Sequence, residues 1–173
     1  MAARIEDYAL IGDCETAALV DNRGTIDWLC WPDFSSEACF AALLGNKENG
    51  FWSICPADGD WTTTRRYRDH TLILETTFRH SAGVVKIIDF MPIRERFSDV
   101  VRIIEGVEGS VPMQMDLRLR FDYGRTVPWV TRISDGVRAV AGPNLAILHA
   151  SVPVRGENLT TVADFTVTPG TRV

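Results

Sequence analysis

The spacing of turn signals is the feature that most constrains the fold of this chain. From residue 51 onward, short runs rich in β-branched and aromatic residues alternate with turn residues such as glycine, proline and asparagine. The runs recur roughly every eight to twelve residues, which is typical of a two-sheet β fold. We therefore predict an all-β protein, an antiparallel β-sandwich, with strands in 51–55, 61–67, 72–78, 84–90, 100–107, 113–123, 127–133, 137–141, 145–152 and 159–167.

The clearest of these strands covers residues 113–123. Its apolar residues alternate with polar ones, which predicts one face in the core and one face in solvent. The apolar set is Met113, Met115, Leu117, Leu119, Phe121 and Tyr123, and the polar set is Gln114, Asp116, Arg118, Arg120 and Asp122. We expect the acids and arginines of the polar face to form solvated side-by-side ion pairs.

The N-terminal part predicts a hairpin followed by one helix. Residues 15–20 and 25–31 flank the turn signal Asp21-Asn22-Arg23-Gly24, and Pro32 closes the second strand. Beyond it, Ser35 or Ser36 can cap a short helix near residues 35–44, with Gly45 at its C-terminal end.

Composition limits the classes of protein and partner. At 173 residues the chain is long enough to bury roughly 70% of its unfolded surface, so we predict a single domain over residues 1–173. A net charge of −5, with 18 basic and 23 acidic residues, argues against a nucleic-acid partner. No run approaches the roughly 20 apolar residues of a membrane span, and the acidic N-terminus does not fit a signal peptide, so we expect no membrane partner and a cytoplasmic location.

The cysteines and histidines predict neither a metal site nor a cofactor. The cysteines at 14, 30, 39 and 55 form no C-x-x-C pair, and the histidines at 70, 80 and 149 are far apart. We expect the cysteines to be reduced and buried.

One corner is a candidate ligand site. Trp31, Asp33 and Phe34 lie where the 25–31 strand gives way to the predicted helix. An aromatic face beside a carboxylate suits a sugar ring, which offers both C–H faces and hydroxyl edges. The alternative is that Trp31 and Trp28 simply belong to the core, the usual fate of aromatic residues in strands. Because most tryptophans of this chain lie in strand patterns, we expect no strong sugar affinity.

No catalytic pair is evident. Glycoside hydrolysis needs two carboxylates about 5 to 10 Å apart, and Asp7, Asp13, Asp27, Asp33 and Glu37 are the acids that the first part of the chain offers. Nothing in their spacing selects two of them, and there is no nucleophile elbow, phosphate loop or zinc pattern.

Several motifs in series resemble the opening of bacterial family 15 glycoside hydrolases, the glucoamylase-like and trehalase-like proteins. They span almost the whole chain and are 5–13 (IEDYALIGD), 16–20 (TAALV), 24–34 (GTIDWLCWPDF), 40–45 (FAALLG), 66–67 (RY), 74–78 (LETTF), 89–92 (DFMP), 101–102 (VR) and 120–124 (RFDYG). The step Pro32-Asp33-Phe34 departs from the pattern, because many relatives carry arginine after the proline.

The resemblance implies a function and a partner. In that family an N-terminal β-sandwich precedes a catalytic (α/α)6 barrel that carries the general acid and general base, so the chain would be a non-catalytic domain that packs on the barrel of the same polypeptide and shapes its active-site mouth. The isolated chain would be inactive and the parent an inverting hydrolase of glucoamylase or trehalase type. The alternatives are a carbohydrate-binding module for α-glucosides and a stand-alone protein-interaction domain.

The end of the chain suggests an open sheet edge. Pro169-Gly170-Thr171 follows the 159–167 strand as a turn, and we expect the returning strand to pair with 159–167. Because only two residues follow the turn, we expect an unpaired edge and hence a possible homo-oligomer.

Overall fold

The protein is an antiparallel β-sandwich, which confirms the predicted fold class. The structure, a computed structural model, describes residues 3–57, 59 and 61–173. Within them the chain forms three antiparallel sheets connected by short loops. Every helical segment in these residues is a single 3-10 turn: η1 (Ile5–Asp7), η2 (Ala42–Leu44), η3 (Lys47–Asn49) and η4 (Asp122–Gly124).

One long sheet forms the first layer. Its strand order is β1-β2-β3-β5-β10-β15-β14, and β4 pairs with β3 beside this path. The strands are β1 (Ala9–Gly12), β2 (Ala17–Val20), β3 (Thr25–Cys30), β4 (Ala38–Phe40), β5 (Phe51–Pro56), β10 (Val111–Arg118), β14 (Arg155–Glu157) and β15 (Thr160–Val167).

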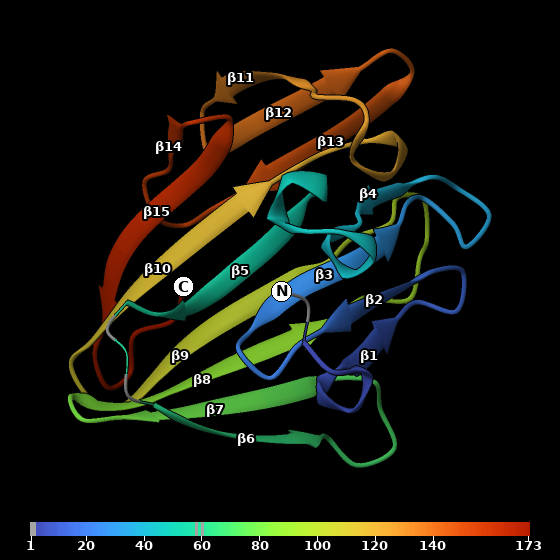
Figure 1. Cartoon of the computed structure of the whole chain (residues 1–173). Coiled ribbons are helices and arrows are strands. Elements are labelled where there is room, and N and C mark those ends of the chain that lie inside the picture. Colours follow the sequence, from blue (N-terminus) through green and yellow to red (C-terminus); the bar gives the residue numbers. More distant parts are fainter. Residues whose placement is uncertain (1–2, 58, 60) are drawn as a thin grey trace.

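Two smaller sheets complete the sandwich. The four-stranded sheet has the order β6-β7-β8-β9, and the three-stranded sheet the order β11-β12-β13. Figure 1 shows the first at the bottom of the view in green and the second at the top in orange. The strands are β6 (Thr62–Tyr67), β7 (Leu74–His80), β8 (Gly83–Phe90), β9 (Val101–Gly109), β11 (Trp129–Ile133), β12 (Gly136–Ala141) and β13 (Asn144–His149).

All three sheets contribute to one apolar core. Alternate residues of each strand point inward, because successive side chains in a strand face opposite sides. The core includes Ile26, Ile54 and Met113 from the long sheet, Phe78, Ile87 and Ile104 from the four-stranded sheet, and Val137, Ala139, Ala146 and Leu148 from the three-stranded sheet. The long sheet therefore shares its core with two separate smaller sheets.

The predicted N-terminal hairpin is present, and the predicted strands around residues 72–78 and 84–90 form a second one. Strands β2 and β3 are antiparallel around the Asp21–Gly24 turn, and β7 pairs with β8 along its whole length. Gly24 has a φ of 80°, and a Cβ there would clash with the carbonyl oxygen of Ile54, so the turn needs glycine both for its conformation and for the close approach of β5.

The helix predicted near residues 35–44 is absent. Residues Ala38–Phe40 form β4, whose pairs with β3 are Leu29 with Phe40 and Cys30 with Ala38. Only Ala42–Leu44 is helical, as the 3-10 turn η2. Three consecutive residues of β4 are buried, which an amphipathic surface helix would not allow, and pairing with the free edge of β3 satisfies their backbone groups.

The strand predicted over 113–123 ends at Arg118. Residues Met113, Met115 and Leu117 are buried and alternate with half-buried polar residues, as expected. Beyond them Asp122 and Tyr123 both adopt positive φ, which turns the chain out of the sheet at η4. Because regular alternation stops there, Arg120 is buried, at 4% exposure, rather than on the solvated face as predicted.

The end of the chain pairs with a different strand than predicted. After the turn, the amide of Val173 donates to the carbonyl of Ile104, and the amides of Ile104 and Gly106 donate to the carbonyls of Val173 and Thr171. Residues 171–173 thus run beside β9 rather than β15. The sheet twist carries the end of β15 over to the four-stranded sheet, where β9 offers a free edge.

Candidate functional site

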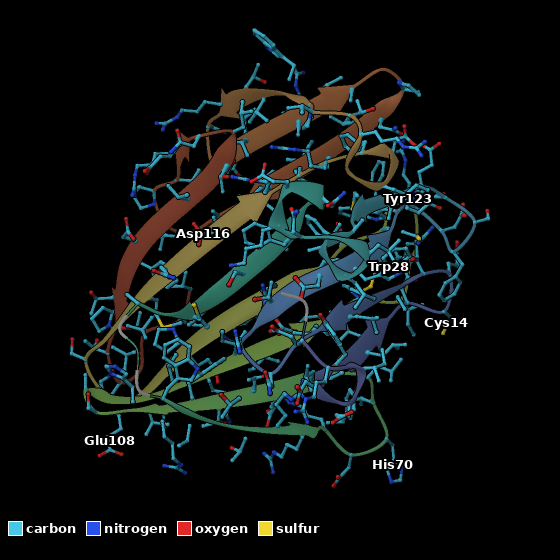
Figure 2. The ribbon with its side chains drawn as sticks, in the orientation of Figure 1. Cys14, Trp28, His70, Glu108, Asp116 and Tyr123 are labelled. Carbon is cyan, nitrogen blue, oxygen red and sulfur yellow. The ribbon has the colours of Figure 1, made fainter. Side chains whose placement is uncertain are left out.

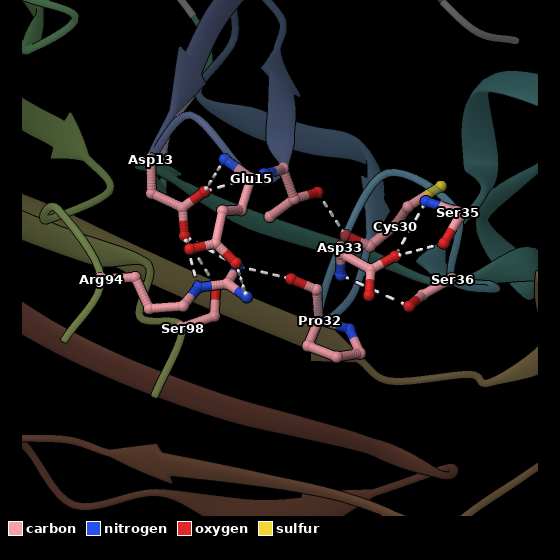
Figure 3. Close-up of polar contacts among 10 residues, drawn as sticks. Asp13, Glu15, Cys30, Pro32, Asp33, Ser35, Ser36, Arg94 and Ser98 are labelled. Atoms are coloured by element: carbon pink, nitrogen blue, oxygen red, sulfur yellow. Dashed lines mark hydrogen bonds and ion pairs between the residues drawn. The ribbon is translucent and has the colours of Figure 1, made fainter. Parts of the chain in front are cut away.

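Three loops meet at one end of the sandwich, around the buried carboxylate of Asp13 (Figure 3). Its Oδ1 accepts the backbone N–H groups of Glu15 at 3.0 Å and Thr16 at 2.8 Å. Its Oδ2 accepts Arg94 Nε at 3.1 Å, Arg94 Nη2 at 2.9 Å and Ser98 Oγ at 3.2 Å. One carboxylate therefore organises the 12–16 turn and fixes it to the loop that follows β8.

Arg94 extends this network to a third loop. Its Nη2 also donates to the carbonyl oxygen of Pro32, and its Nη1 lies 3.0 Å from Glu15 Oε2. The side chain is 13% exposed and that of Asp13 is fully buried. Burial by itself raises the pKa of Asp13, but the hydrogen bonds from Thr16, Glu15 and Arg94 outweigh it and hold this pKa below its ordinary value. Asp13 is thus an ionised anchor at neutral pH that holds the three loops together.

The three residues of the predicted ligand site, Trp31, Asp33 and Phe34, have different surroundings. Asp33 accepts hydrogen bonds from the Ser35 amide at 2.9 Å and the Ser35 hydroxyl at 2.7 Å, and these lower its pKa. It therefore stabilises its own loop. Trp31 is half-buried against the core, whereas Phe34 is 65% exposed. The structure does not bring the three side chains around one ligand-sized space.

Trp31 instead lines a hollow of about 340 Å³ between β9 and β13. Trp52 and Arg102 line the same hollow, and the Arg102 guanidinium lies 5.2 Å from the centre of the Trp52 ring. Neither Asp33 nor Phe34 is part of it. The hollow lies between the four-stranded sheet and the three-stranded sheet.

The loops tied by Arg94 present large apolar side chains to solvent. Ile93 is 87% exposed, Phe97 is 67% exposed, and Phe34 belongs to the same loop assembly. Figure 2 places Cys14, the one exposed cysteine, at this end of the molecule together with Trp28 and Tyr123, and Glu108 at the opposite end. We call Phe34, Ile93 and Phe97 the apolar corner. Rigid loops with exposed aromatic and aliphatic side chains are typical of an interaction surface.

Sequence reasoning missed Arg94 as the organiser of this corner. It appeared only within a charged stretch, and its carboxylate partner is 81 residues away in the chain. A single acid between two strands was the only available signal. Such a long-range pair cannot be read from spacing.

A second acid, Asp27, is buried elsewhere in the long sheet. The Tyr8 hydroxyl donates to its Oδ2 at 2.7 Å, and burial, the largest influence, raises the pKa of Asp27. Asp21 nearby is also buried, and its pKa is likewise raised by burial. Buried acids with raised pKa values are typical of active sites but also of structural networks. Asp27 is therefore the acid to test for any activity of this chain.

The tryptophans differ in exposure. Trp28, Trp31, Trp52 and Trp61 are half-buried and pack against core clusters, in agreement with the core interpretation. Trp129, at the start of β11, is 78% exposed. Trp129 is therefore the one tryptophan in the described residues that is largely exposed to solvent, and it lies on the three-stranded sheet.

Comparison with protein families decides where the chain belongs. Residues 1–169 match the family model described as trehalase-like, N-terminal. The chain belongs to this family. Because the match covers nearly all of the chain, the β-sandwich as a whole is a trehalase-like N-terminal domain, and the motifs that run from Ile5 to Gly124 are part of it.

Curated relatives of this trehalase-like domain are trehalases. The chain is 31% identical over 139 residues to a trehalase of Thermoplasma volcanium, covering 77% of this chain and 22% of the relative. It is 36% identical over 134 residues to trehalase 1 of Sulfolobus acidocaldarius, covering 78% and 23%. A trehalase of Mycobacterium tuberculosis is 28% identical over 141 residues, covering 70% and 20%.

The chain thus spans about a fifth of the length of the trehalases it matches. No solved structure gives a significant match to the trehalase-like domain. In the described residues, no helix has the length and apolar character needed to cross a membrane.

Proposed function

We propose that this chain is the non-catalytic N-terminal domain of a family 15 α-glucoside hydrolase of trehalase type. Its partner is a catalytic (α/α)6 barrel in the same polypeptide. One observation carries the proposal: the chain matches an N-terminal family over residues 1–169, yet spans only about a fifth of the trehalases related to it. The chemistry of those enzymes then belongs to the remaining four fifths.

The apolar corner supports a packing role. Phe34, Ile93 and Phe97 are 65%, 87% and 67% exposed, and the loops that carry them are held by the Asp13–Arg94 network. Prearranged apolar side chains reduce the entropy lost on docking. The corner would contact the barrel and shape the mouth of its active site.

Enzyme assay of the 173-residue chain tests the absence of catalysis. Purified chain is incubated with trehalose, maltose, dextrin and an aryl α-glucoside, and glucose release is compared with a blank. We expect no release, because hydrolysis needs an acid and a base positioned together. Activity that disappears in Asp27→Asn or Asp13→Asn would contradict the proposal.

A carbohydrate-binding module is the second candidate, and exposed Trp129 is the observation that favours it. Aromatic faces are common platforms for sugars, but Trp129 has no second exposed tryptophan beside it in the described residues. We expect any dissociation constant for a malto-oligosaccharide or trehalose to be weaker than about 0.1 mM, or about −5.5 kcal/mol. Tighter binding that is lost in Trp129→Ala, or in Trp31→Ala at the predicted ligand site, would favour the second candidate.

A further inference from the structure

A groove opens between the three-stranded sheet and the part of the long sheet that contains β10 and β14. Its lining residues lie between 117 and 161 and include none of the Asp13 network. Its volume is about 390 Å³, and apolar side chains form most of its wall, including Leu117, Val130, Val137 and Leu159. Asn158 and Glu157 lie at its rim, and Arg120 is the arginine that lines it. The groove is large enough for an amino acid side chain with its neighbours, or for a small ligand.

Arg120 is buried without a carboxylate. Its residue exposure is 4%, and no acidic oxygen of the described residues lies within salt-bridge distance. Its Nη1 donates to two backbone carbonyls, of Leu119 at 2.6 Å and Leu159 at 3.5 Å. Its Nε and Nη2 have no hydrogen-bond partner among the described residues, and neither atom is sealed from solvent. Two nitrogen atoms of a groove-lining arginine therefore have no hydrogen-bond partner among the described residues.

The surrounding charges do not compensate this cation. Burial lowers the pKa of Arg120, and the nearby Arg118 lowers it further. The Glu48 carboxylate raises the pKa of Arg120, but it forms its ion pair with Arg118. Glu157 is turned to Arg155, 3.6 Å away. A largely buried cation without an acidic partner is costly, which makes an added negative group favourable at this place.

We propose that this groove binds an acidic side chain flanked by apolar residues, contributed by the catalytic part of the same polypeptide. The inference rests on the proposed function and names a docking surface for it. Two free N–H groups of one guanidinium match the two oxygens of a carboxylate, which forms short charge-assisted hydrogen bonds. The apolar walls suit the flanking residues. A neutral sugar would leave the buried cation uncompensated.

The first experiment tests the chemistry of the groove on the 173-residue chain. The probe is 3-phenylpropionate, and 3-phenylpropionamide is its neutral isostere. Binding is followed by ¹⁵N NMR of the arginine Nε–H and tryptophan indole signals. We expect the carboxylate to bind at least ten-fold tighter than the amide, with shifts at Arg120 and Trp129.

Variants locate this preference. Arg120→Gln should abolish it, Glu157→Gln should strengthen carboxylate binding, and Arg138→Gln, on the exposed side of β12, is the matched control that should leave it unchanged. Unchanged amide spectra elsewhere show that each variant is folded. Equal affinity for acid and amide in the wild-type chain would overturn the proposal.

The second experiment tests the source of the carboxylate in the longer polypeptide. Amide hydrogen exchange of residues 127–130 and 156–161 is compared between the 173-residue chain and the full polypeptide. We expect at least ten-fold slower exchange there in the full polypeptide, retained in Arg138→Gln and lost in Arg120→Gln.

Two failures are distinguishable. Slowed exchange at the apolar corner but not at the groove overturns this inference and leaves the proposed packing on a barrel intact. The same slowing at the groove in Arg120→Gln as in wild type also overturns it. No slowing anywhere in residues 1–173 contradicts the proposed function itself, and the docking surface with it.

Discussion

The two halves of the sandwich treat buried charge differently. In the half covered by the four-stranded sheet, Arg102 donates to both oxygens of Asp89, at 2.9 and 3.4 Å, and to the carbonyls of Trp52 and Gly24. In the half covered by the three-stranded sheet, Arg120 is just as buried but contacts only backbone carbonyls. The first half is electrostatically complete within the domain, and the second is not.

Exposed apolar residues occur in both halves, because Val107 of β9 is 51% exposed and the loop after β8 carries the exposed Ile93 and Phe97. On the three-stranded sheet, Trp129, Leu145 and Ile147 are 78%, 58% and 45% exposed. In the four-stranded sheet, the buried carboxylate of Glu75 is contacted by Arg66, Arg68 and Lys86, and the hydrogen bond from Arg68 leads in lowering its pKa. The two halves therefore differ in buried charge: the four-stranded half pairs its buried Arg102 with an acid, whereas Arg120 beside the three-stranded sheet has no acidic partner in the described residues.

The largest effect should come from Asp89→Asn. The change leaves Arg102 buried without its counter-charge, and we expect the free energy of unfolding to fall by about 3 to 5 kcal/mol. Urea denaturation measures it. Asp116→Asn, which neutralises a half-buried acid that forms no ion pair in the described residues, is the control and should change stability by less than about 0.5 kcal/mol. A loss below about 1 kcal/mol in Asp89→Asn would show that the pair is not essential.

Asp13→Asn should have an intermediate effect, because it weakens the charge-assisted bonds from Arg94 while the loops stay in place. We expect a loss of about 2 kcal/mol. Glu15→Gln is the control: it changes an exposed acid that contacts the same Arg94, and should cost less than about 1 kcal/mol.

The stability that Asp13 contributes should depend on pH. The pKa of Asp13 is lowered in the folded protein, so its contribution is fully present above its unfolded pKa, near 4, and is lost as the pH falls through the folded value. The difference in stability between wild type and Asp13→Asn should therefore shrink in acid. A difference that stays constant between pH 7 and pH 3 would contradict this role.

Arg120→Met should have little effect on the 173-residue chain. Removing an uncompensated buried cation relieves its desolvation cost, which offsets the loss of its carbonyl contacts. We expect a change within about 1 kcal/mol, in either direction, by the same urea titration. A loss as large as that of Asp89→Asn would mean that Arg120 is satisfied within the domain, and the contrast between the halves would fail.

The smallest effect concerns the outer edge of β15. Only residues 160–162 pair with β14, so residues 163–167 have β10 as their one neighbour. Outward amides in 163–167 should exchange faster than those of residues 113–117, which lie between β5 and β15. Weak self-association at millimolar concentration should slow them. Equal exchange in both strands, with a strictly monomeric chain, would show that this edge is protected.

The fold class and most of the strands could be predicted from local sequence patterns. Alternation at Met113, Met115 and Leu117 and the turn at Gly24 are local signals, and each reflects a backbone or side-chain preference that tertiary contacts did not override. The motifs also sufficed to place the chain in its family.

The remaining features depend on contacts between residues that are far apart in the chain. Residues 38–40 became a strand because β3 offered a free edge, although the cap at Ser35 or Ser36 and the glycine at 45 had predicted a helix. Trp31, Asp33 and Phe34 were neighbours in sequence but point to different surroundings. Arg94 reached Asp13 across 81 residues, and Arg120 was turned inward where the strand ended. Burial and long-range pairing depend on how sheets stack, and local sequence patterns do not specify that stacking.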